Sequence, residues 1–374
     1  MPAESWRGRD AVCLLRYDSS TTRPFLTVLT MPVPSVPRRA LRLVRSTLRP
    51  IVKPGVPLPP AKRFHGHFAL VRSVVEGLEA IGADFNYDPR SLSQLARVVY
   101  APANEALRQA ADLKRRGRID FLIAGPSNAL FPEEADNILW QPEIDLLIEP
   151  SEWVRDLFRS IAPALVSKIR ICPAGVDTDA WQPADAAVEH KALVYWKSGD
   201  EAFCAHVESI LEAQGLRPIR LRYGHYTPAE YKRALDDSVL AVFLSAFETQ
   251  GLALAEAWSM DVPTLVWNPR AEASWRGRSF AAGSSAPYLS PVTGLPWDRI
   301  EDLPKALEHT LGHIEEFHPR AWVLGNMTDA RCSRMLFDII KAESSGSASG
   351  TSSATTNSEP HTEADVGKGV AGES

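Results

Sequence analysis

Two short apolar runs, joined by a polar turn and a helical segment, constrain the fold of this chain more than any other feature. Residues 239–244 are apolar, residues 245–251 are a polar turn, and residues 252–260 are mostly strong helix formers. A second apolar run follows at 264–267. Short apolar runs are typical of buried strands, and strands connected through a helix run parallel. We therefore predict a β–turn–α–β unit whose turn lies where open α/β sheets bind ligands, at the carboxyl end of a strand.

This turn and the start of its helix carry groups that suit a phosphate-linked polyol. Backbone N–H groups at a helix N-terminus attract anions, and here they belong to Gln250, Gly251 and Leu252. The ionised carboxylates of Glu248 and Glu256 only accept hydrogen bonds, which suits the hydroxyl pairs of sugars. The alternative is structural: Glu248 complements the helix dipole, and Glu256 is an exposed helical residue.

Three motifs in this order resemble those of the family 4-type glycosyltransferases (glycosyl transferases group 1). Glu248 and Glu256 match the E-x7-E signature of that family. Residues 173–179 (PAGVDTD) resemble the segment that opens the carboxyl-terminal domain of these enzymes, and residues 150–154 (PSEWV) resemble their PSEW segment. The resemblance extends over roughly residues 60–340 and is specific for fold and class, but not for substrate.

The resemblance implies the GT-B fold, an α/β architecture of two Rossmann-like, doubly wound parallel-sheet domains facing across a cleft. We expect a variable amino-terminal region, an acceptor-side domain, a nucleotide-sugar-binding domain, a helix that crosses back to the first domain, and a tail. These parts cover residues 1–60, 61–168, 169–325, 326–343 and 344–374. The tail is rich in Ser, Gly, Thr and acidic residues, so we expect it to be disordered.

By resemblance, the protein is an enzyme that transfers a sugar from a nucleotide diphosphate sugar to an acceptor that the sequence does not identify, with retention and without metal. Such an enzyme must stabilise the negative charge left on the diphosphate. Lys197 lies near the family's basic residue for this role, and Arg222 is a weaker candidate. An ordinary exposed lysine is the alternative for Lys197. The chain also departs here from the commoner family pattern of a Gly-Arg pair and a later Lys-Gly, which leaves the exact set of basic residues open.

The resemblance also assigns the other donor contacts. Glu256 would bind the ribose hydroxyls and Glu248 the donor sugar, while the backbone of residues 250–252 would meet the sugar or the phosphate. The loop with Gly224 and Tyr226 would lie against the nucleoside base. A tyrosine that simply packs in its loop is the alternative.

On the acceptor side, His65-Gly66-His67 precedes the first clear helix. Gly66 would admit a substrate, and a histidine, for which we name His67, would transfer a proton near neutral pH. A structural histidine pair is the alternative. The turn at residues 125–128 would face the same cleft.

Composition argues against several other classes. The net charge of −5 argues against a dedicated nucleic-acid binder, and the four cysteines show no C-x-x-C spacing. Asp177-Thr178-Asp179 looks like a D-x-D metal motif, but we expect a structural role for it and neither a catalytic metal nor a cofactor. No apolar run reaches the roughly 18 residues that span a bilayer, and the start lacks a signal-peptide layout, so we expect a cytoplasmic protein.

Basic and apolar residues alternate between positions 38 and 53. This segment would be either a cationic amphipathic helix on an anionic membrane surface or the solvated basic face of an insertion.

Two rival functions remain open. A nucleotide-sugar epimerase of the same fold would need further acid–base residues, and a non-catalytic GT-B protein would bind a sugar nucleotide without turning it over.

Overall fold

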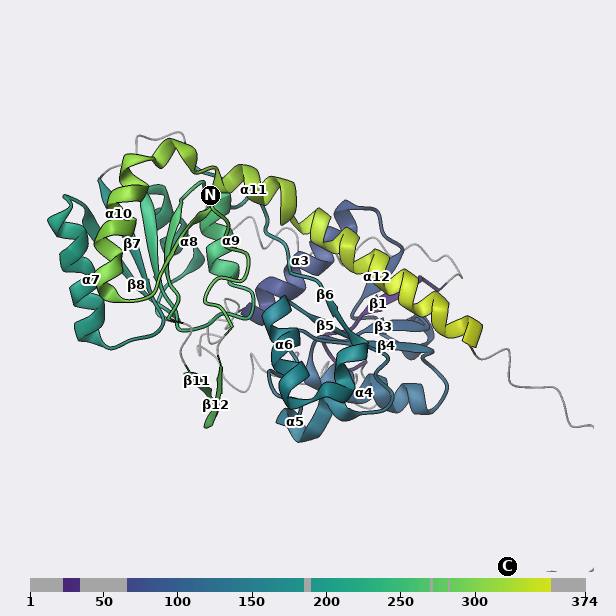
Figure 1. Ribbon diagram of the computed structural model, residues 1–374. Coiled ribbons are helices and arrows are strands. Elements are labelled where there is room, and N and C mark those ends of the chain that lie inside the picture. The colour runs from purple at the N-terminus through teal and green to yellow at the C-terminus, as the bar shows by residue number, and fades with distance from the viewer. Residues whose placement is uncertain (1–22, 34–65, 185–189, 270–271, 282, 351–374) are drawn as a thin grey trace, which may run out of the picture.

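The protein consists of two α/β units (Figure 1). The computed structural model describes residues 23–33, 66–184, 190–269, 272–281 and 283–350. Each unit has one parallel sheet with helices on both faces, so the predicted pair of doubly wound sheets is confirmed. The basic segment at 38–53 and most of the predicted tail lie outside the described residues.

The amino-terminal unit is built on a six-stranded sheet with the order β2-β1-β3-β4-β5-β6, in which all pairings are parallel. Its strands are β1 Leu26–Val28, β2 Phe85–Tyr87, β3 Val98–Tyr100, β4 Phe121–Ala124, β5 Leu146–Glu149 and β6 Ile169–Ile171. Strands β1, β3, β4 and β5 are buried along their whole length. A parallel sheet covered on both faces needs such uninterrupted apolar strands.

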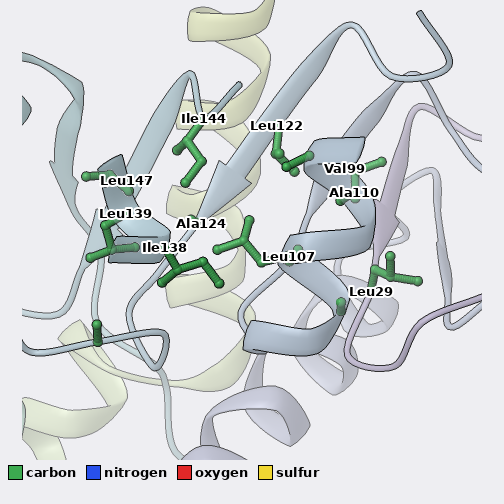
Figure 2. Close-up of a cluster of buried hydrophobic side chains, with 14 of the residues drawn as sticks. Leu29, Val99, Leu107, Ala110, Leu122, Ala124, Ile138, Leu139, Ile144 and Leu147 are labelled. Carbon is green, nitrogen blue, oxygen red and sulfur yellow. The ribbon is translucent and has the colours of Figure 1, made fainter. Parts of the chain in front are cut away.

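Helices cover both faces of this first sheet. They are α3 Gly66–Ala80, α4 Asn104–Arg115, α5 Glu134–Asn137 and α6 Glu152–Ile161, with short 3-10 turns η1 Leu92–Gln94, η2 Ile138–Trp140 and η3 Pro163–Lys168. Figure 2 shows one of the two cores, in which Leu107 of α4 and Ile138 of η2 lie with Leu122 of β4. The other face packs against α3.

The carboxyl-terminal unit has a five-stranded parallel sheet with the order β13-β10-β9-β7-β8. Its strands are β7 Lys191–Trp196, β8 Arg217–Arg222, β9 Leu240–Leu244, β10 Thr264–Trp267 and β13 Gly294–Trp297, and a separate antiparallel hairpin pairs β11 Glu272–Trp275 with β12 Arg278–Ala281. The helical elements are α7 Glu201–Ala213, α8 Pro228–Asp236, α9 Leu252–Ser259, η4 Ile300–Asp302, α10 Leu303–Gly312, η5 Ile314–Glu316 and α11 Pro319–Asn326. The strand order reverses between β7 and β9, and such a reversal point is where open sheets bind ligands.

The last helix, α12 Asp329–Gly350, runs back over the amino-terminal unit and packs against α3 (Figure 1). Leu336, Phe337 and Ile340 of α12 are buried in the same core as Val74 of α3. Gly77 makes this close packing possible, because a Cβ there would lie 2.2 Å from the Ser333 hydroxyl oxygen.

Two boundaries differ from those expected. The second domain was expected to begin at 169, but β6 pairs with β5, so the change of sheet comes after Ile171. A three-residue strand with a central arginine gives too short an apolar pattern to be recognised. Disorder was expected from 344, whereas α12 continues to Gly350.

We expect Phe337→Ala to destabilise the protein by about 3–5 kcal/mol, the usual cost of deleting a buried aromatic side chain. Phe337 is 5% exposed and meets the Phe25 ring edge-on, with the centroids 5.5 Å apart. Urea unfolding measures the change. The control is Met335→Ala, because Met335 lies on the same helix and is 39% exposed. Equal losses for the two variants would show that α12 does not depend on this packing.

Candidate functional site

The turn between β9 and α9, residues 245–251, forms the centre of the candidate site. Gly251 precedes the helix with a φ of +86°, a backbone conformation that glycine adopts without strain. A Cβ at Gly251 would also lie 2.9 Å from the Cδ1 atom of Leu254. The first N–H groups of α9 have no partner within the helix, so this end of α9 can attract an anion.

Two side chains of the amino-terminal unit hold the turn by its backbone. The Ser151 hydroxyl donates to the carbonyl oxygen of Thr249 at 2.6 Å, and the indole N–H of Trp153 donates to that of Glu248 at 2.9 Å. Ser151 immediately precedes α6, where its side chain makes no capping hydrogen bond, and Trp153 lies in the first turn of this helix. The PSEW segment, recognised from the sequence only as a family motif, therefore positions the turn.

Gln250 and Leu252 have structural side chains. The Gln250 amide donates to the carbonyl oxygen of Ala174 at 2.7 Å and accepts from its N–H at 2.9 Å. Leu252 packs against the core between α3 and the first sheet. Only the backbone of these residues was predicted to meet a ligand, and that role stays a prediction.

Lys197 and Glu248, two of the predicted catalytic residues, lie together at the point where the strand order reverses. Lys197 follows β7 and Glu248 follows β9. The Lys197 Nζ atom lies 2.7 Å from Glu248 Oε1, to which the Ser245 hydroxyl also donates at 2.8 Å. Nζ also lies 5.0 Å from the centroid of the Tyr223 ring, a contact that the sequence did not indicate. The pair provides a cation beside a carboxylate that can accept hydrogen bonds.

Glu256 lies on α9 in a different electrostatic environment. Burial raises the pKa of Glu256 to about 8, the charge of Arg72 opposes this rise, and the charge of Asp329 adds to it. Arg72, on α3, pairs with Asp329 at 2.8 Å and with Glu76 at 2.6 Å. Glu256 is therefore not the freely exposed helical glutamate of the structural alternative.

In the predicted base-binding loop with Gly224 and Tyr226, the tyrosine contacts other residues of the protein. The hydroxyl of Tyr226 donates to that of Tyr195 at 2.9 Å, and the two rings pack against each other. Gly224 is exposed with a φ of +79°, and the guanidinium of Arg222 lies 4.9 Å from the centre of the Trp196 ring. The geometry of Tyr226 favours the alternative of a packed tyrosine.

The remaining predicted residues are placed as follows. His67 is half-buried in the first turn of α3, where Gly66 begins the helix; His65 lies outside the described residues. The Asp177 carboxylate accepts from the backbone N–H groups of Asp179 and Ala180, which gives it a structural role.

In the part of the chain that the structure describes, no group of three or more His, Cys, Asp or Glu side chains is arranged to hold a metal ion. None of the helices described is long and apolar enough to cross a membrane.

Several solved structures are similar to this chain. HepE of Anabaena, in complex with UDP and glucose, is 14% identical with a TM-score of 0.51, over 86% of this chain and 100% of that one. The lipopolysaccharide outer core galactosyltransferase WaaB is 10% identical with a TM-score of 0.52, over 85% and 99%. No family model matches the sequence, and no curated protein matches it. These likenesses establish the fold alone: the chain has the GT-B fold, as predicted.

We expect Glu256→Gln to change how stability depends on pH. With a pKa near 8 in the folded protein and about 4.5 unfolded, the folded state holds one more proton between these values. Stability then falls as pH rises through this window, by at most about 1.4 kcal/mol per pH unit for one proton. The glutamine variant should lack this fall. Urea unfolding at several pH values between 5 and 8 measures it, with exposed Glu212→Gln as the control; parallel curves for parent and Glu256→Gln would contradict the prediction.

Proposed function

We propose that this protein is a glycosyltransferase that moves a sugar from a nucleotide diphosphate sugar to an acceptor. The observation that carries the proposal is the Lys197–Glu248 pair, at the carboxyl ends of the two strands where the second sheet reverses its order. The fold supports it, because HepE, a structure of the same fold, contains UDP and glucose. Fold alone does not determine function, so the proposal rests mainly on the side chains at this point.

Each charged group would have a separate task. The Lys197 ammonium has three donors, so it can contact a diphosphate oxygen while it stays beside Glu248. It would stabilise the charge that develops on the diphosphate when the anomeric bond breaks, together with the N-terminal amides of α9. Glu248 would accept hydrogen bonds from the donor sugar, and Glu256 from the ribose.

Four further features of the proposal stay predictions. Retention at the anomeric carbon and transfer without metal come from the family resemblance, whereas a cytoplasmic location and proton transfer by His67 were expected from the residues of the sequence. Contact with a membrane through residues 38–53 also stays a prediction. Product analysis after incubation with UDP-glucose and candidate acceptor sugars separates a transferase from an epimerase and from a non-catalytic binder.

The two carboxylates give the sharpest test. Above pH 8, where the Glu256 carboxyl group is ionised, Glu256→Ala should weaken UDP binding by about 10- to 150-fold, the range for one charged hydrogen bond. Glu248→Ala should weaken binding of UDP-glucose more than binding of UDP, because its proposed partner is the sugar. Calorimetric titration with both ligands measures these effects, and Glu212→Ala, an exposed site on α7, is the control.

Two outcomes would count against these assignments. If Glu248→Ala loses both ligands while Glu256→Ala binds like the parent, the two carboxylates are assigned wrongly. If folded variants of both residues bind UDP and UDP-glucose like the parent, the donor site lies elsewhere and the proposed function loses its support.

A further inference from the structure

A cavity of about 230 Å³ lies beside the turn at 245–251, between the amino-terminal unit and the hairpin of β11 and β12. Ser127 and Asn128, which follow β4, line one part of it, and Glu149 at the end of β5 lines another. Thr249 of the turn and Trp275 of the hairpin also line the cavity. The space therefore lies beside Thr249, the residue that follows Glu248, and is bounded by both units.

Glu149 is the unusual residue of this cavity. It is 2% exposed, and its carboxyl group has no hydrogen-bond or ion-pair partner among the residues that the structure describes. Burial raises the pKa of Glu149 well above its ordinary value, which favours the neutral carboxyl group over the carboxylate. A neutral carboxyl group can donate one hydrogen bond and accept others, and leaving it unpaired in a buried place costs free energy. A ligand hydroxyl, which also both donates and accepts, would satisfy it.

The wall beside Glu149 is held in place before any ligand arrives. The side-chain oxygen of Asn128 accepts from the N–H of Gly125, and its amide donates to the side-chain oxygen of Asn104 at 2.9 Å. Asn128 is itself 4% exposed. This part of the cavity is therefore rigid and polar.

The hairpin forms the opposite wall and is tied to the amino-terminal unit. The indole N–H of Trp275 donates to Glu134 at 3.0 Å, and Arg278 pairs with Glu133 at 2.6 Å. Phe280 of the hairpin stacks on Trp153, with the ring planes 3° apart. The side chain of Trp275 is nevertheless 40% exposed, so part of it is open to contact.

We propose that this cavity binds the acceptor, and that the acceptor presents a neutral, hydroxyl-rich ring of monosaccharide size whose hydroxyl pairs with Glu149. The inference rests on the proposed function, because it takes the neighbouring turn as the donor site. The volume equals that of about seven or eight liquid waters, enough for one sugar ring. The hydrogen-bonding wall suits the ring hydroxyls, and the indole of Trp275 suits the apolar edges of a ring. The charged groups of the lining, Arg276 and Glu134, pair with each other at 3.7 Å, so the cavity suits a neutral ligand.

Saturation-transfer NMR on the full-length protein with saturating UDP tests this proposal, with glucose, galactose, N-acetylglucosamine and glucosamine as probes. At least one neutral sugar should bind. Glu149→Ala should weaken that binding roughly 2- to 10-fold, the range for one neutral hydrogen bond. Glu149→Gln should keep it within about twofold, because a neutral amide still donates and accepts.

Matched tryptophan variants locate the sugar without disturbing the core. Trp275→Ala should weaken sugar binding, whereas Trp140→Ala, equally exposed at 40% but outside the cavity lining, should not. This pair also decides the case if Glu149→Ala fails to fold. An unchanged affinity in Trp275→Ala overturns the proposal, as does binding of glucosamine alone, which would indicate a cationic occupant.

Measuring UDP binding separates a failure of the acceptor proposal from a failure of the proposed function. If UDP binds and depends on Glu256 but no neutral sugar binds, the acceptor inference fails and the proposed function stands. If neither UDP nor any sugar binds the folded protein, the proposed function fails as well.

Discussion

The hydrogen bonds from Ser151 and Trp153 to the turn at 245–251 link the two halves of this molecule at the point where its proposed chemistry would occur. Both donors belong to the amino-terminal unit, and both acceptors are backbone carbonyls of the carboxyl-terminal unit. A backbone carbonyl cannot be repositioned by a rotamer change, so these bonds fix where Glu248 and the start of α9 face. A buried carbonyl oxygen that lost its donor would be left without a hydrogen bond, which costs free energy. This cost opposes any sliding of one unit on the other. The ring of Trp153 extends the same contact, because Phe280 of the hairpin stacks on it.

Charge is distributed unevenly around this contact. Lys197 and Glu248 form a nearly isolated pair, whereas Arg72 on the other side has Glu76 and Asp329 as close partners and Asp177 at 3.8 Å. One guanidinium cannot balance three carboxylates, and Glu256 lies in the same field. Burial keeps Glu256 hard to ionise, the charge of Arg72 opposes this effect, and the charge of Asp329 adds to it. A ligand that donates hydrogen bonds to this group would therefore relieve a cost already present in the folded protein.

The sequence predicted the features that depend on local pattern. The unit β9–α9–β10 was expected within one residue of its observed bounds, because apolar runs, helix formers and a proline break act locally. The closeness of Lys197 and Glu248 can also be inferred from the sequence, since residues that follow neighbouring parallel strands meet at one edge of the sheet. The hydrogen bonds of the Gln250 and Tyr226 side chains could not be predicted from local pattern, because their partners, Ala174 and Tyr195, are distant in the sequence. Glu149 was not predicted as a site residue. It is the last residue of an apolar strand and directly precedes the PSEW segment, so its burial becomes clear only from the fold.

Asp329, the first residue of α12, determines how closely the two units approach on the side away from the hairpin. A Cβ on Gly175, in the segment that leads out of the first sheet, would lie 2.5 Å from the Cα atom of Asp329. A Cβ on Gly77 of α3 would lie 2.3 Å from the Asp329 carbonyl oxygen. Both contacts require glycine, and the Asp329 carboxylate is bound by Arg72 of α3 as well. Three segments that are distant in the sequence thus meet at one residue with no room to spare. Because interiors packed this tightly resist deformation, the return of α12 and the bonds from Ser151 and Trp153 hold the two units together at two separate places.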